Sequence, residues 1–117
     1  MRHRKEKIHL GRTLTHRKEL IAQLATSFFL YEKIETTIAK AKALRPYAEK
    51  LITKAGNDTV AARRSADNKL THKNAVKKLF EVLGPKYKDR KGGYTRIQRS
   101  GIRKGDSGEK AIISLVD

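Results

Sequence analysis

The stretch of residues 84–116 constrains the fold more than any other part of the chain. Two short β-rich runs, Tyr94–Ser100 and Ala111–Val116, flank a glycine-rich turn, which is the composition of a β-hairpin. The second run is apolar enough to be the buried strand of a sheet, whereas the segment before the hairpin is cationic and bends at glycines. The sequence therefore predicts a hairpin that joins the hydrophobic core to a binding surface.

Apolar residues at helical spacing occupy most of the chain before the hairpin. We expect Thr15 to cap a first helix, and the short β-branched run Lys33–Thr37 to form a strand. Thr37 is then placed to cap a second helix that Pro46 kinks and Gly56 ends. The expected apolar face of the first helix comprises Leu20, Ile21, Leu24, Ala25, Phe28 and Tyr31.

Two shorter helices are expected before the hairpin. Asp58 is positioned to cap a third helix, and Thr71 to open a fourth that Gly84 and Pro85 stop. The residues expected in the core include Leu24, Phe28, Leu79, Phe80, Ile113 and Leu115.

These elements follow one another in the order α-β-α-α-α-β-β, which defines the fold class as α+β. A single strand between helices and a late hairpin predict a three-stranded sheet with helices on one face, a two-layer α/β sandwich. Ala111, Ile113 and Leu115 are expected to point at the helices, because side chains alternate along a strand. We expect a basic extended N-terminal arm at residues 1–14 and a single globular α+β domain at residues 15–117.

Positive charge is concentrated in two segments. The chain has 28 Lys and Arg against 12 Asp and Glu, a net charge of +16. Residues 1–18 hold seven bases and one acid, and residues 86–104 hold eight bases and one acid. A merely solubilising surface would intersperse the two signs. We therefore predict a polyanionic partner that is bound by both segments, the arm and the loop before the hairpin.

The residues around the second basic segment suggest how a nucleic acid would be held. Gly92 and Gly93 lack side chains, which would let the backbone approach RNA closely or turn sharply. Tyr87 and Tyr94 lie among the bases and could stack on an unpaired nucleotide. Packing of Tyr94 on the sheet is an equally good interpretation.

Catalytic, metal-binding and membrane functions find little support. The acids are scattered, and neither a nucleophile elbow nor a phosphate loop is present, so we predict no enzyme activity, no catalytic residues and no cofactor. The four histidines show no strong metal-ligand spacing and the chain has no cysteine, which argues against a metal site and suits a reducing cytosol. No apolar run approaches the roughly 18 residues that a membrane span needs. We expect neither a membrane partner nor a small-molecule substrate.

Several motifs add a family resemblance. They are Met1-Arg2-His3-Arg4-Lys5, His16-Arg17, Ala62-Arg63-Arg64, Lys78-Leu79-Phe80 and, above all, Gly92-Gly93-Tyr94-Thr95-Arg96-Ile97. In these motifs the chain resembles the bacterial-type family of large-subunit ribosomal protein seventeen, essentially over its whole length. The resemblance implies a cytoplasmic, ribosome-bound structural constituent of the ribosome. It also implies that the protein binds large-subunit ribosomal RNA near the polypeptide exit tunnel, beside neighbouring large-subunit proteins, and supports subunit assembly.

Charge and resemblance together give the candidate residues for binding ribosomal RNA. They are Arg2, His3, Arg4, Lys5, Lys7, Arg12, His16, Arg17, Lys18, Arg63, Arg64, Lys86, Tyr87, Lys88, Arg90, Lys91, Gly92, Gly93, Tyr94, Arg96 and Arg99. The last two arginines differ in parity along their strand, so they should not share a face of the sheet.

Two other classes of protein remain open. A free-standing nucleic-acid-binding protein of the nucleoid type would usually show a groove-entering recognition helix or a dimer zipper, and neither stands out. A cationic membrane-surface protein would need a helix with a basic face opposite a strongly apolar one, whereas the charges here gather in the arm and the loop.

Overall fold

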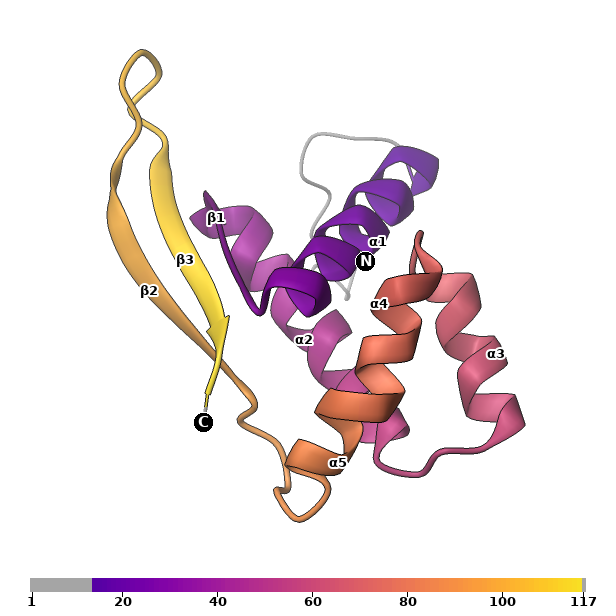
Figure 1. The fold of residues 1–117 in the computed structure, drawn as a ribbon. Helices are drawn as coiled ribbons and strands as arrows, with labels where there is room; N and C mark the ends of the chain where they lie inside the picture. The colour runs from indigo at the N-terminus through magenta and orange to yellow at the C-terminus, as the bar shows by residue number, and fades with distance from the viewer. Residues whose placement is uncertain (1–13, 117) are drawn as a thin grey trace, which may run out of the picture.

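The computed structural model of the chain describes residues 14–116 (Figure 1). The elements in chain order are α1 (Leu14–Tyr31), β1 (Lys33–Thr37), α2 (Ile38–Ala55), α3 (Val60–Lys69), α4 (Lys73–Lys78), the π-helical segment η1 (Leu79–Leu83), α5 (Gly84–Tyr87), β2 (Thr95–Ile102) and β3 (Glu109–Leu115). The predicted α+β class, with one early strand and a late hairpin, is confirmed.

The three strands form one antiparallel sheet in the order β1-β3-β2. The most apolar strand, β3, lies at the centre, with Ile113 opposite Ile34 on one side and Ile97 on the other. Between Arg99 and Gly101 the register of the hairpin shifts, which places Ser100 in a β-bulge. The hydroxyl of Ser100 donates to Glu35 Oε2 at 2.7 Å and so ties the two edge strands together across β3.

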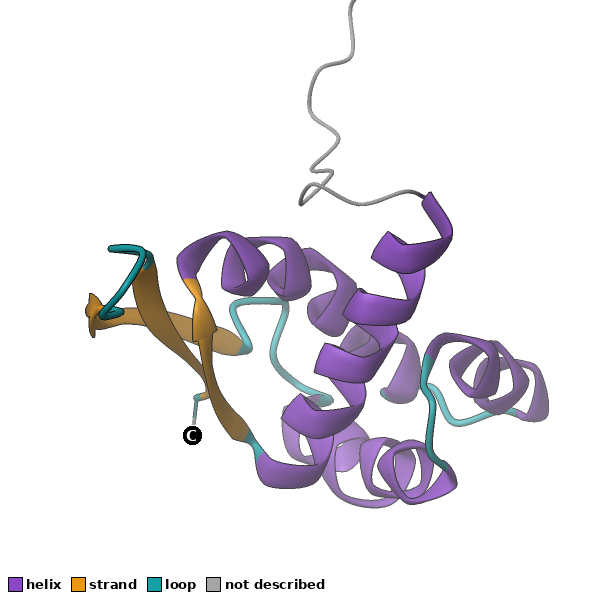
Figure 2. Cartoon of the chain, turned by 90° about the horizontal axis from the view of Figure 1, so that it is seen from above, coloured by secondary structure: helices purple, strands orange, loops and turns teal. Residues whose placement is uncertain are grey.

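The helices lie on one side of the sheet (Figures 1 and 2). Ala111 and Ile113 are fully buried beneath them, as their alternation in β3 predicted. The largest buried side chains are Phe28, Phe29, Leu44, Leu51, Ile52, Leu79, Leu83 and Ile113. They come from α1, α2, η1 and β3 and belong to one continuous core.

Helix α2 begins and ends where the sequence predicts. The side chain of Thr37 accepts a hydrogen bond from the backbone N–H of Lys40 at 3.3 Å, and Gly56 follows the last helical residue. Pro46 lies inside α2 on its exposed side, and the helix continues past it.

The predicted caps of the other helices are wrong. Helix α1 already includes Leu14, so Thr15 lies within it. Thr59, not Asp58, caps α3 by accepting from the N–H of Ala62 at 3.0 Å. Competition for the side chain explains this difference, because the Asp58 carboxylate is held by Arg63.

At the fourth helix the cap is His72, whose Nδ1 accepts from the N–H of Asn74 at 3.1 Å. Thr71, the predicted cap, instead donates its backbone N–H and its hydroxyl to Thr26 Oγ1 at 2.9 and 3.1 Å. These contacts join the start of α4 to α1.

The predicted stop at Gly84 and Pro85 is also wrong. The chain passes from η1 straight into α5, with Gly84 in right-handed helical geometry and Pro85 in the first turn, where its missing N–H is tolerated. Gly84 is buried against Ala55 of α2, and a Cβ there would lie 2.5 Å from the Ala55 carbonyl oxygen. The glycine therefore allows close approach of two helical segments and does not end one.

Two residues of the predicted core, and Tyr31 of the predicted apolar face of the first helix, are less buried than expected. Leu24 and Leu115 are half-buried at its edge, and Tyr31 is 72% exposed at the end of α1. Phe29, which the predicted helical face omitted, is fully buried. Phe28, Leu79, Phe80 and Ile113 are buried as predicted.

Candidate nucleic-acid interface

The N-terminal candidates for RNA binding lie outside the described residues. They are Arg2, His3, Arg4, Lys5, Lys7 and Arg12, and with them residues 1–13 of the predicted arm. The candidates at the start of α1 are described: His16 and Lys18 are exposed, and Arg17 is half-buried. The first turn of α1 itself contains no acidic residue.

Arg63 is held by an ion pair within the protein. Its guanidinium donates to both carboxylate oxygens of Asp58, at 2.7 and 2.8 Å, and lies 5.2 Å from the centre of the Phe80 ring. The hydrogen bonds from Arg63 lower the pKa of Asp58, so the pair is charged at neutral pH and locally balanced. Arg64 next to it is exposed. Of the two predicted contacts on α3, Arg64 is exposed, whereas Arg63, with its side chain 41% exposed, is already paired with Asp58.

The two tyrosines predicted as stacking platforms are buried. Tyr87 is 3% exposed and Tyr94 is 4% exposed, and their rings meet edge to face with centres 5.3 Å apart. The hydroxyl of Tyr87 donates to the carbonyl of Val116, and that of Tyr94 donates to the carbonyl of Arg90 at 3.0 Å. Base stacking by either ring is incompatible with this arrangement. The alternative interpretation placed Tyr94 on the sheet; the ring is indeed buried, and it packs against Tyr87 of α5 with its hydroxyl beside Thr53 of α2.

Residues 88–94, which we call the glycine loop, connect α5 to β2 and display cations. Gly92 and Gly93 have φ angles of +96° and +64°, a region that residues with a Cβ rarely adopt. Nothing lies within 4 Å of a Cβ built at either position. These glycines therefore serve the turn of the backbone. Lys88, Arg90 and Lys91 are exposed on the same loop.

The remaining candidates of the second basic segment lie on different surfaces. Lys86 on α5 places its Nζ 5.2 Å from the centre of the Tyr87 ring. Arg96 shares a rung of the sheet with Ser114 and Lys33, whereas Arg99 pairs with buried Ala111. As predicted, the two arginines have opposite parity on β2. Arg99 also donates to Glu109 Oε1 at 3.2 Å, so part of its charge is balanced.

The second basic segment consequently does not form a single patch. Figure 1 shows the glycine loop at one end of the sheet and the hairpin turn, with Arg103 and Lys104, at the other. In that turn Arg103 is engaged by the Asp106 carboxylate at 2.5 Å. Sequence neighbours in this segment are thus separated by the length of the hairpin.

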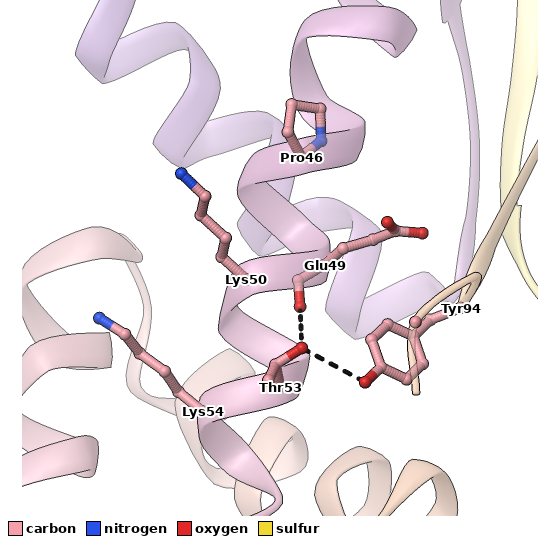
Figure 3. Close-up of a pocket in the computed structure, with 7 residues that line it drawn as sticks. Pro46, Glu49, Lys50, Thr53, Lys54 and Tyr94 are labelled. Carbon is pink, nitrogen blue, oxygen red and sulfur yellow. Dashed lines mark hydrogen bonds between the residues drawn. The ribbon is translucent and has the colours of Figure 1, made fainter. Parts of the chain in front are cut away.

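A hollow of about 470 Å³ lies between α2 and the glycine loop (Figure 3). Lys50 and Lys54, one helical turn apart and exposed on α2, line it together with Thr53. Gly92 and Tyr94 line it from the glycine loop. An adjoining hollow of about 460 Å³ shares Thr53, Gly92 and Tyr94 and adds Lys88, Arg90 and Lys91.

Lys50 and Lys54 were missed by the sequence reasoning. The predicted basic segments are runs of charge along the chain, whereas the bases of α2 are not adjacent in the sequence. The signal was present in the spacing: Lys42, Lys50 and Lys54 fall on the exposed side of a helix whose buried residues are Ala41, Leu44, Ala48, Leu51, Ile52 and Ala55.

Neither metal chemistry nor membrane insertion is supported by the described part of the chain. Between residues 14 and 116 no group of three or more His, Asp or Glu side chains is placed to hold a metal ion. Within the same range no helix is long and apolar enough to cross a membrane.

A small α+β scaffold with exposed cations on several surfaces is typical of the class of proteins that bind polyanions. Comparison with known proteins specifies the family. The sequence model of the family "Ribosomal protein L17" matches residues 20–116, and the chain belongs to this family. It is therefore a structural constituent of the ribosome and not an enzyme, and it is ribosome-bound in the cytoplasm.

Three relatives illustrate the closeness of the match, and each is described as "Large ribosomal subunit protein bL17". The protein from Koribacter versatilis is 51% identical over 116 residues, which cover 99% of this chain and 72% of the relative. The protein from Endomicrobium trichonymphae is 50% identical over 107 residues, or 92% of each chain. The protein from Rickettsia bellii is 49% identical over 117 residues, which cover all of this chain and 82% of the relative.

Proposed function

We propose that this protein binds large-subunit ribosomal RNA through its exposed lysines and arginines and thereby supports assembly of the large subunit. The proposal also includes the predicted neighbourhood, near the polypeptide exit tunnel and beside other large-subunit proteins. Family membership and the names of the relatives support the subunit. The family resemblance of the sequence supports the neighbourhood.

The observation that carries the proposal is the number of exposed cations without an acidic partner. Among the described residues, Lys18, Lys50, Lys88, Lys91 and Arg96 are exposed, and no ion pair joins any of them to a carboxylate. Such charges repel one another in the free protein. They bind favourably to a phosphate backbone because condensed counterions are released.

The buried tyrosines change how RNA would be held. With Tyr87 and Tyr94 in the core, the glycine loop offers lysines, an arginine and backbone but no aromatic ring. Contacts to phosphate position an RNA without reading its base sequence. The protein therefore recognises the shape of folded RNA.

Sedimentation of a native lysate on a sucrose gradient tests the proposal against the two alternative classes. We expect the protein to travel with large subunits and to remain there after nuclease removes DNA. Sedimentation with DNA would favour the nucleoid-type alternative, and recovery with membranes would favour the membrane-surface alternative. A structure of the assembled subunit tests the exit-tunnel neighbourhood, which a position far from the tunnel mouth would contradict.

A further inference from the structure

We propose that a strand of RNA backbone crosses the exposed side of α2, from the groove beside the glycine loop toward α3. Lys50 and Lys54 would contact its phosphates from α2, and Lys88 and Lys91 from the loop. This inference rests on the proposed binding of ribosomal RNA and adds a particular site to it. The two lysines of α2 lie outside the basic segments predicted from the sequence.

The shape of the surface supports an extended ligand. The two hollows of about 470 and 460 Å³ meet at Thr53, Gly92 and Tyr94, so they form one continuous groove. A third, smaller hollow of about 50 Å³ shares Lys50 and Lys54 and reaches Lys69 at the end of α3. The basic surface therefore continues from the glycine loop across α2 to α3.

The charge of the groove is positive and largely unbalanced. No ion pair within residues 14–116 joins Lys50, Lys54, Lys88 or Lys91 to a carboxylate. Among the described residues that line the hollows, Glu49 is the one carboxylate.

Glu49 is already engaged inside the protein. Its Oε2 accepts from the N–H and the hydroxyl of Thr95 at 3.3 and 3.0 Å, and Arg45 lies 3.8 Å away. Its carboxylate points toward the strands in Figure 3, away from Lys50 and Lys54. The acid therefore fixes β2 to α2 and makes no ion pair with either lysine. Both lysine side chains extend away from Tyr94 in Figure 3, and Lys54 Nζ contacts only the hydroxyl oxygen of Ser65 on α3, at 3.5 Å, among the described residues.

The glycine loop is held in place before any ligand binds. Tyr94 Oη donates to the carbonyl of Arg90 and lies 3.3 Å from Thr53 Oγ1 on α2. The backbone N–H of Val116 donates to the carbonyl of Tyr94 at 2.9 Å. A loop fixed in this way loses little conformational entropy when it binds, which favours affinity.

The chemistry of the groove selects backbone over bases. Lysine ammonium groups act as point charges toward phosphate and do not offer the planar fork that reads base edges. Of the aromatic rings that line the hollows, Tyr87 and Tyr94 are buried and cannot stack. Half-buried Tyr47 donates its hydroxyl to the Lys69 carbonyl at 2.6 Å, and Lys69 Nζ lies 5.8 Å from the centre of its ring. Binding in this groove is thus expected to be independent of base sequence and strongly dependent on salt.

The test compares two double variants of the full-length protein that remove equal charge at equal spacing. Lys50→Gln with Lys54→Gln changes the groove. Lys73→Gln with Lys77→Gln changes two exposed lysines, also four residues apart, on α4. Binding of each variant to a large-subunit ribosomal RNA fragment is measured from about 50 to 300 mM salt, a range that resolves such slopes.

We expect the groove variant to bind about ten- to fiftyfold more weakly at 100 mM salt and to lose about 1.4–1.8 units of log–log slope, at roughly 0.7–0.9 per phosphate contact. The α4 variant should stay near wild type, and both should keep the wild-type melting temperature because the four lysines are exposed. A groove variant with the wild-type slope, or an equal loss in the α4 variant, would overturn the inference alone. Failure of the wild-type protein to bind would instead overturn the proposed function.

Discussion

Gly84 lies where two helical segments come closest. Its φ of −55° is ordinary for any residue, so the requirement for glycine is one of space. A Cβ at this position would lie 2.5 Å from the carbonyl oxygen and 2.9 Å from the carbonyl carbon of Ala55. Both are backbone atoms of α2, which cannot move aside without moving the helix.

Gly84→Ala is expected to lower the free energy of unfolding by about 1–3 kcal/mol, because an added methyl group in a tightly packed site forces the backbone apart. Denaturant melts measure the change. Pro85→Ala is the control, since Pro85 is exposed and next in the chain, and it should change the value by less than about 1 kcal/mol. Equal stability of Gly84→Ala and wild type would show that α2 and α5 are not in close contact.

Asp106 stabilises the turn of the hairpin. The Arg103 guanidinium donates to its two carboxylate oxygens at 3.1 and 2.5 Å, and the N–H of Gly108 donates to it at 3.0 Å. The Arg103 hydrogen bonds, and after them that from Gly108, lower the pKa of Asp106 from the usual 3.8 to about 2.

A carboxyl NMR titration should therefore find Asp106 titrating near pH 2. Because its pKa is lower in the folded protein, the ionised carboxylate stabilises the turn above about pH 4, and this stabilisation is lost as the pH falls through about 2. In Arg103→Gln the midpoint should rise toward 3.8. A wild-type midpoint already at that value would show that the Arg103 contact does not persist in solution.

Among the elements, the π-helical segment η1 has one side buried in the core and the other exposed to solvent. Leu79, Phe80 and Leu83 are buried, whereas Glu81 and Val82 are exposed. The Phe80 ring also lies beneath the Arg63 guanidinium, which fixes α3 against this segment.

Phe80→Ala should lower the free energy of unfolding by about 3–5 kcal/mol, the range for removing a buried phenylalanine ring. Val82→Ala is the matched control two residues away, and we expect a change within about 0.5 kcal/mol because Val82 is on the surface. Urea unfolding followed by far-UV circular dichroism gives both values. A loss below about 0.5 kcal/mol in Phe80→Ala would place its ring outside the core.

The elements that the sequence predicted well are those with a local signal. Strand β1 is short and β-branched, helix α2 keeps the helical period, and Thr37 between them caps the helix by accepting from the N–H of Lys40. Asp58 and Thr71 have the chemistry of caps, but each is used by a residue that the local sequence does not reveal, Arg63 and Thr26 respectively. Neighbouring residues could cap either helix equally well, and contacts with distant residues determined which of them does.

The sequence predicted that the interface is cationic, but it did not predict which residues lie together on the surface. The glycine loop was expected from its charge and its glycines, and it displays its cations. Tyr87 and Tyr94 were expected there as well, but both are buried. The Tyr87 hydroxyl donates to the carbonyl of Val116, and the Val116 N–H donates to the carbonyl of Tyr94. The pairing of this loop with Lys50 and Lys54 depends on how α2 packs on the sheet, which charge counting along the sequence does not reveal.

At the scale of the whole molecule, the exposed cations surround the fold. Lys18 lies on α1, Lys50 and Lys54 on α2, Lys91 on the glycine loop, and Arg96 on β2. A protein with this arrangement can contact several segments of a folded RNA at once. Most of its affinity should then come from phosphate neutralisation and not from any single contact.

The most direct test of that account is the salt dependence of binding to large-subunit ribosomal RNA. The wild-type protein is compared with a variant in which Lys50, Lys54, Lys88, Lys91 and Arg96 are all replaced by Gln. We predict that the logarithm of the wild-type binding constant falls linearly with the logarithm of salt concentration, and that the variant loses up to about four units of slope. A wild-type affinity that does not change with salt, or a variant that keeps the wild-type slope, would contradict the account.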